Sequence, residues 1–117
     1  MAEQGVERRK YKRYIANSEA ELFAFSVETP RFIGKGVVTD ISLGGLRFES
    51  NIEFPHDDVL VKFYLPGYMK LFAIRCLRVR TGKEPNRFVY GFKVSEARFS
   101  EKVRLWWYLF SHKNVLT

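Results

Sequence analysis

The chain has 117 residues, enough for one domain with a buried core but too few for two. Its apolar fraction of 46%, with 11 Phe and 6 Tyr, excludes a disordered tail. A formal net charge of +7 favours an anionic partner such as a nucleotide, a nucleic acid or a membrane headgroup, although surplus Lys and Arg also serve simply to keep a small domain in solution.

The only cysteine, Cys76, excludes an intramolecular disulfide and fits a reducing compartment. The charges near the N-terminus are not followed by an apolar run, so we expect no signal peptide. The longest uninterrupted apolar stretch, Leu105 to Phe110, is too short to cross a bilayer. We therefore expect a cytoplasmic protein that does not insert into membranes.

The first 14 residues are polar and basic and cannot bury enough surface to hold one conformation, so residues 1–14 are predicted to form a flexible N-terminal arm. Residues 15–117 are predicted to form a single domain. Alternating apolar residues between turn signals predict six strands, an all-β pattern typical of an antiparallel barrel or sandwich. In chain order they are Phe23–Val27 (with a start from about residue 19), Gly36–Ile41, Leu46–Phe48, Val59–Leu65, Met69–Arg80 and Phe88–Val94.

Two elements of this pattern are unusual. The fifth strand changes phase between Ile74 and Leu77, which predicts a bulge near Arg75 and Cys76. The last element, about residues 100–114, is predicted to be a helix, because apolar residues recur there with helical spacing. The face expected to pack on the strands, closing one end, is Val103, Trp106, Trp107 and Phe110, whereas Leu105 and Leu109 point roughly the other way and are either buried too or offered to a partner.

Catalysis and metal binding have little support. His56 and His112 lie in unrelated contexts, and no histidine and cysteine residues share metal-ligand spacing. The carboxylate pair Asp57-Asp58 follows a proline and is typical of a turn. We expect no catalytic residue, no metal and no enzyme activity.

A basic motif, Arg9-Lys-Tyr-Lys-Arg13, places two guanidinium groups four residues apart in the arm. Arginine offers a rigid fork of donors that grips a phosphate or the O6/N7 edge of guanine, and its plane stacks on a purine. The alternative is a solvated basic run or a nonspecific nucleic-acid arm, which basic clusters alone more often are.

A second motif, Asp40-Ile-Ser42-Leu-Gly-Gly45, occurs where a strand must turn. Asp40 is able to accept hydrogen bonds from guanine N1–H and N2–H₂, which adenine does not match, and Ser42 adds a small donor and acceptor. Gly44 and Gly45 permit positive φ and a close approach of the main chain to a ligand. The alternative is a β-turn with an Asx cap.

Together the two motifs resemble the two-part signature of the PilZ domain, a family of bacterial receptors for cyclic di-GMP. The likeness covers nearly the whole chain, including the late Tyr90-Gly91-x-x-Val94 segment. The resemblance implies a six-stranded antiparallel β-barrel with a C-terminal α-helix, and a receptor that binds cyclic di-GMP without a cofactor. It also implies an adaptor that orders its arm on binding ligand and relays the signal to a protein effector.

The same resemblance assigns residues. Arg9 and Arg13 hold guanine edges and phosphates, Asp40 and Ser42 read a guanine, and Gly45, next to Gly44, shapes the turn.

Three more arginines are assigned by the resemblance. In similar proteins an arginine at the position of Arg8 accompanies a stacked pair of ligand molecules. An arginine on a late strand covers the exposed guanine, here Arg78 or Arg80. The other open interpretation is a basic β-barrel that binds nucleic acid through stacked aromatic residues, and Asp40 would obstruct a phosphate backbone there.

Overall fold

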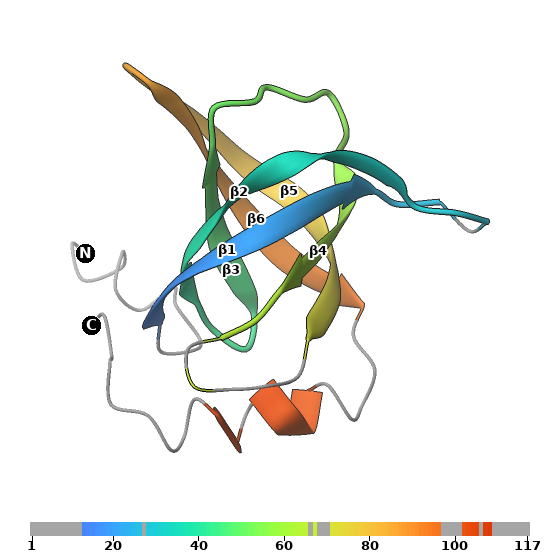
Figure 1. Ribbon diagram of the computed structural model, residues 1–117, viewed down its shortest axis with the longest axis vertical. Coiled ribbons are helices and arrows are strands. Elements are labelled where there is room, and N and C mark those ends of the chain that lie inside the picture. The colour runs from blue at the N-terminus through green and yellow to red at the C-terminus, as the bar shows by residue number, and fades with distance from the viewer. Residues whose placement is uncertain are drawn as a thin grey trace, which may run out of the picture.

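A computed structural model describes residues 13–26, 28–65, 67, 71–96, 102–105 and 107–108 of the chain. Six antiparallel strands close into a barrel in the order β1-β2-β3-β6-β5-β4 (Figure 1), which confirms the predicted all-β fold and decides between barrel and sandwich. Each of these strands pairs with a neighbour on both sides along part of its length, so the barrel has no edge strand. The strands are β1 (Tyr14–Ala24), β2 (Arg31–Ile41), β3 (Gly45–Ser50), β4 (Asp58–Phe63), β5 (Phe72–Glu84) and β6 (Arg87–Glu96).

The barrel interior is filled by the alternating apolar residues of its strands. Val59, Val61 and Phe63 of β4 are buried, as the period of two predicts. On β6, Tyr90 is also buried, and its hydroxyl donates a hydrogen bond to the carbonyl of Ile52 at 2.9 Å. Burial raises the pKa of the Tyr90 phenol above its usual value, so this group remains a neutral donor.

Strand β1 begins at Tyr14, earlier than the predicted start near residue 19. Its inward face carries small residues, Ala16, Ser18 and Ala20, so the alternation of apolar and polar residues is weak there. Phe23, one of the alternating residues that predicted this strand, does not lie in the core. Phe23 is only partly buried on the outer face, in edge-to-face contact with Phe32 at a centroid distance of 5.5 Å.

The pairing of β5 with β6 does shift between Arg75 and Cys76, but the residue that is skipped there is Ser95 of β6. Strand β5 itself keeps its alternation from Phe72 to Cys76, so the predicted bulge is not in β5 at this point. The phase change does not bring Leu77 and Val79 inward, however. Both side chains are exposed, at 42% and 64%. A second shift, between Arg78 and Arg80, was not predicted.

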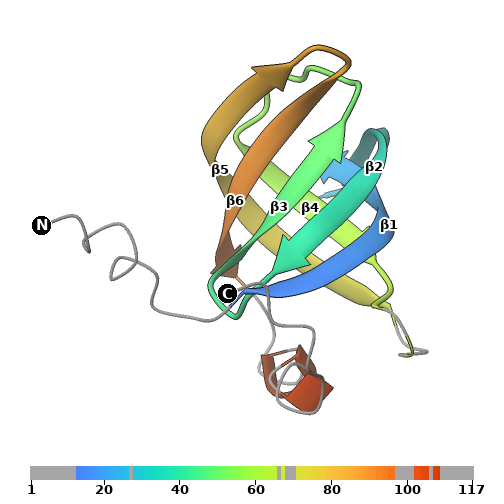
Figure 2. The same cartoon turned by 90° about the vertical axis from the view of Figure 1, so that its left-hand side faces the viewer.

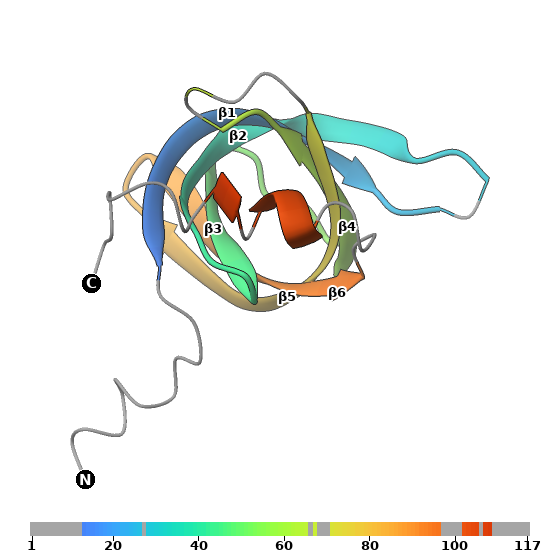
Figure 3. The same ribbon diagram turned by 90° about the horizontal axis from the view of Figure 1, so that it is seen from below.

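The C-terminal helix lies across one open end of the barrel (Figure 3), and its described residues are 102–105 and 107–108. The face that packs is the opposite of the predicted one. Leu105 and Tyr108 are buried in the core, whereas Val103 and Trp107 are 46% and 61% exposed. Because apolar residues occupy both helix faces, periodicity alone could not select between them. Arg104 adds a contact to the barrel, with its guanidinium 4.9 Å from the Phe72 ring.

Some predictions fall outside the described residues: those for residues 1–12, for Ser100 as a helix cap, and for Trp106, Leu109 and Phe110 on the helix. Within the described part of the chain, no helix is long and apolar enough to span a membrane. The same part contains no group of three or more His, Cys, Asp or Glu side chains placed to hold a metal ion.

Candidate functional site

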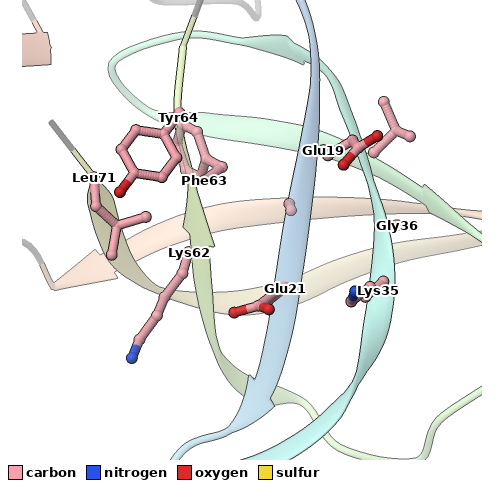
Figure 4. A pocket seen from close by; sticks show the side chains of 10 residues that line it. Glu19, Glu21, Lys35, Gly36, Lys62, Phe63, Tyr64 and Leu71 are labelled. Carbon is pink, nitrogen blue, oxygen red and sulfur yellow. The ribbon is translucent and has the colours of Figure 1, made fainter. Parts of the chain in front are cut away.

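Two hollows lie on the described part of the barrel surface. One lies across β1, β2 and β4 (Figure 4), where Glu21 sits between Lys35 and Lys62 on the paired strands. Tyr64 and Leu71 lie side by side at its other end. None of the predicted ligand residues lines this hollow.

The second hollow, which we call the motif pocket, lies on the outer face of β3, β6 and β5, strands seen side by side in Figure 2. Its volume is about 590 Å³, within the range of small-ligand sites. The described parts of both sequence motifs meet here. The predicted residues that line it are Arg13, Asp40, Ser42, Gly44 and Gly45.

Arg13 and Asp40 form the central contact of the motif pocket. Arg13 directly precedes β1, and Asp40 lies near the end of β2, which pairs with β1. The guanidinium donates to Asp40 Oδ1 from Nε at 2.9 Å and from Nη2 at 2.5 Å. The side chain of Asp40 is only 7% exposed and that of Arg13 is 28% exposed. Limited exposure makes this ion pair stronger than an ordinary surface pair.

Ser42 organises the turn between β2 and β3. Its Oγ accepts hydrogen bonds from the amides of Gly44 and Gly45, each at 3.2 Å. The Ser42 amide in turn donates to the Gly45 carbonyl at 2.8 Å. The hydroxyl therefore holds the two glycines in place, a turn role that the sequence offered as the alternative to ligand binding.

Gly45 is required by packing. A Cβ at this position would lie 2.3 Å from the carbonyl oxygen of Phe92 on β6. Neither Gly44 nor Gly45 uses the positive φ that glycine permits, because among the described glycines only Gly67 has one. The close approach that Gly45 permits is between β3 and the backbone of β6, which brings the turn onto the rim of the motif pocket.

Arg78 and Arg80 have different surroundings in the structure. Arg78 does not line the motif pocket; its guanidinium donates to the carbonyl of Phe54 at 2.9 Å and to Asp57 at 2.9 Å. It also lies 5.2 Å from the Phe54 ring. The prediction that Arg78 covers a guanine thus concerns a side chain that lies away from this pocket, and the pairing shifts between Arg78 and Arg80. Arg80 lines the motif pocket opposite Gly91.

Sequence reasoning missed several residues of the motif pocket, among them Arg47, Lys93 and Gly91. Gly91 pairs with Arg47 on β3 and with Arg80 on β5, so a residue without a side chain separates two cations. A glycine inside an alternating strand signals such a gap. The cations Arg13, Arg47, Arg80 and Lys93 outnumber the acids Asp40 and Glu84, so the lining favours an anion.

The other two predicted arginines of the arm, Arg8 and Arg9, lie outside the described residues. A similar Arg–Asp contact lies elsewhere on the barrel. Arg75 donates to Asp58 at 3.0 Å and 2.7 Å, and this hydrogen bond lowers the pKa of Asp58. Neither residue lines the motif pocket.

Comparisons with known proteins agree with these features. The family model described as the PilZ domain matches residues 7–111. Among curated proteins, none matches the chain.

Three solved structures share the fold. The Bacillus subtilis inhibitor of motility, MotI/DgrA, has a TM-score of 0.69 at 17% identity over 88% of this chain and 49% of its own. The PilZ domain with c-di-GMP of YcgR from Escherichia coli has a TM-score of 0.66 at 14% identity over 89% and 90%. YcgR in complex with c-di-GMP has a TM-score of 0.63 at 16% identity over 89% and 45%. The chain thus spans about half the length of MotI/DgrA and of the longer YcgR structure.

Proposed function

The chain belongs to the PilZ domain family, and on that basis we propose that it is a receptor for cyclic di-GMP and not an enzyme. The observation that carries the proposal is the convergence of Arg13, Asp40, Ser42 and Gly45 on one pocket with a surplus of cations. Structures of YcgR, with which this chain shares its fold, contain the same ligand.

The chemistry of the motif pocket suits each part of this ligand. Asp40 accepts from N1–H and N2–H₂ of a guanine, a donor pair that adenine lacks. Arg13 serves a phosphate, which its fork of donors binds in bidentate fashion. Arg80 borders the bare backbone at Gly91, where a guanidinium is positioned to stack on a purine face.

The proposal includes the arm and a protein effector. The ligand phosphates offset the repulsion among Arg8, Arg9 and Arg13 and draw residues 1–12 against the barrel, which alters the surface available to a partner. The exposed helix face with Val103 and Trp107 supports a partner site there. Arg8 leads us to expect two stacked ligand molecules per chain.

The test is calorimetric titration with cyclic di-GMP, with GMP and a short oligonucleotide as controls. We expect binding of cyclic di-GMP at a ratio near two, and a loss of roughly tenfold to hundredfold in affinity for Asp40→Ala. Asp58→Ala is the matched control, since it removes another arginine-bound carboxylate outside the pocket. Absence of heat with cyclic di-GMP overturns the proposal, and a ratio near one overturns the stacked pair.

Salt separates this receptor from a nucleic-acid-binding barrel. Affinity for the oligonucleotide should be low and should fall steeply between roughly 50 and 200 mM salt, whereas that for cyclic di-GMP should fall much less. Tight, salt-sensitive binding of the oligonucleotide alone would favour the nucleic-acid function.

A further inference from the structure

Arg13 already engages one oxygen of the carboxylate that is proposed to read guanine. Its Nε and Nη2 both donate to Asp40 Oδ1, at 2.9 Å and 2.5 Å. Asp40 is 5% exposed as a residue, so little of its surface remains for another partner. A ligand that uses both oxygens of Asp40 therefore meets a carboxylate that is already engaged at Oδ1 from within the chain.

The internal occupant is a chemical mimic of the expected ligand. Two neighbouring N–H groups in the plane of a guanidinium form a pair of adjacent donors. The N1–H and N2–H₂ groups of guanine form the same kind of pair on the edge of a planar ring. One carboxylate that suits either pair cannot bind both in full, so guanine and Arg13 compete for Asp40.

We infer that Arg13 is a specificity-determining residue that reserves Asp40 for ligands carrying both a guanine and a phosphate. The inference rests on the proposed function. A guanine that displaces Arg13 leaves a partly buried cation without its carboxylate, which is costly. Only a ligand with a phosphate within reach gives the displaced guanidinium a new anionic partner. Guanosine, which has no phosphate, is therefore rejected, whereas cyclic di-GMP completes the exchange.

The surroundings of Arg13 support such an exchange. The motif pocket beside it is lined by Arg47, Arg80 and Lys93, so a phosphate there meets several cations at once. The side chain of Arg13 is 28% exposed, which leaves it room to turn away from Asp40. Arg13 also lies directly ahead of β1, so its movement does not require a strand to break.

The test compares guanosine with cyclic di-GMP on the wild type and on Arg13→Ala, by chemical-shift titration of the ¹⁵N-labelled protein. We expect Arg13→Ala to bind guanosine roughly tenfold more tightly than the wild type and to bind cyclic di-GMP at least roughly tenfold more weakly. Adenosine should show no gain. Arg75→Ala, which breaks the similar contact with Asp58, is the matched control and should leave both affinities unchanged. Equal or weaker guanosine binding by Arg13→Ala overturns the inference.

A second measurement needs no variant. In the wild type without ligand, the Arg13 Hε proton should show a through-space NMR contact with Asp40. This contact should disappear when cyclic di-GMP is added. Persistence of the Arg13–Asp40 contact in the saturated complex overturns the exchange. Failure of the wild type to bind cyclic di-GMP refutes the proposed function instead. The guanosine comparison still decides whether Arg13 limits the access of a guanine to Asp40.

Discussion

Gly45→Ala is expected to destabilise the barrel strongly, because β3 and β6 approach each other closely at this residue. The added Cβ would lie 2.3 Å from the carbonyl oxygen of Phe92, whereas ordinary contacts of a Cβ are 3.4–4 Å. The obstacle is backbone, so no side chain can rotate away. The strands must separate by about an ångström where the amide of Val94 donates to the carbonyl of Gly44 at 2.9 Å.

Overpacking of this kind costs about 2–3 kcal/mol. For a domain near this size, each kcal/mol lowers Tm by roughly 4–8 °C, so the expected loss is roughly 8–24 °C. The assay is thermal unfolding followed by circular dichroism, with urea unfolding to obtain the free energy of unfolding.

Gly82→Ala is the matched control for this prediction. Gly82 also borders the motif pocket on a strand, but a Cβ there would lie 3.8 Å from the carbonyl oxygen of Val89, an ordinary contact. We expect Gly82→Ala to unfold within a few degrees of the wild type. An unchanged Tm for Gly45→Ala, or an equal loss in both variants, would refute the argument from close approach.

Three further outcomes follow from the geometry. Arg78→Ala should lower stability by about 1–3 kcal/mol in urea unfolding without altering affinity for cyclic di-GMP, since its guanidinium binds Asp57 and backbone carbonyls. Arg80→Ala should instead weaken the binding of cyclic di-GMP and leave the free energy of unfolding unchanged, in the same two assays. Burial raises the pKa of Cys76 from 9.0 to about 12, so the thiol should resist a disulfide reagent until urea unfolds the chain, and stability should fall as pH rises from about 9 towards 12 because only the unfolded thiol ionises. Rapid labelling of the native protein, or a flat profile over that pH range, would contradict this account of Cys76.

The sequence was most informative where large apolar side chains alternate with polar ones. Val59, Val61 and Phe63 predicted β4 and its buried face correctly. The early part of β1 was missed because its inward residues, such as Ala16 and Ala20, are small and give little contrast. Prediction of a strand thus depended on how large its buried side chains are.

The motif pocket was only partly predictable for a different reason. Asp40 and Ser42 belong to one local motif, so their neighbourhood could be inferred from the chain itself. Arg47 and Lys93 reach the same pocket through the pairing of β3 with β6, and local spacing does not encode that register. The choice between the late arginines depended on a bulge between Arg78 and Arg80 that no sequence signal marked.

The central claim is that cyclic di-GMP binds in the motif pocket. The most direct test is to map its binding on the ¹⁵N-labelled protein by amide chemical shifts. We expect the largest shifts at Ser42, Gly45 and Gly91, and little change at Lys35 and Lys62 in the hollow on the other strands. Shifts centred on that other hollow, or no shifts at saturating ligand, would contradict the account.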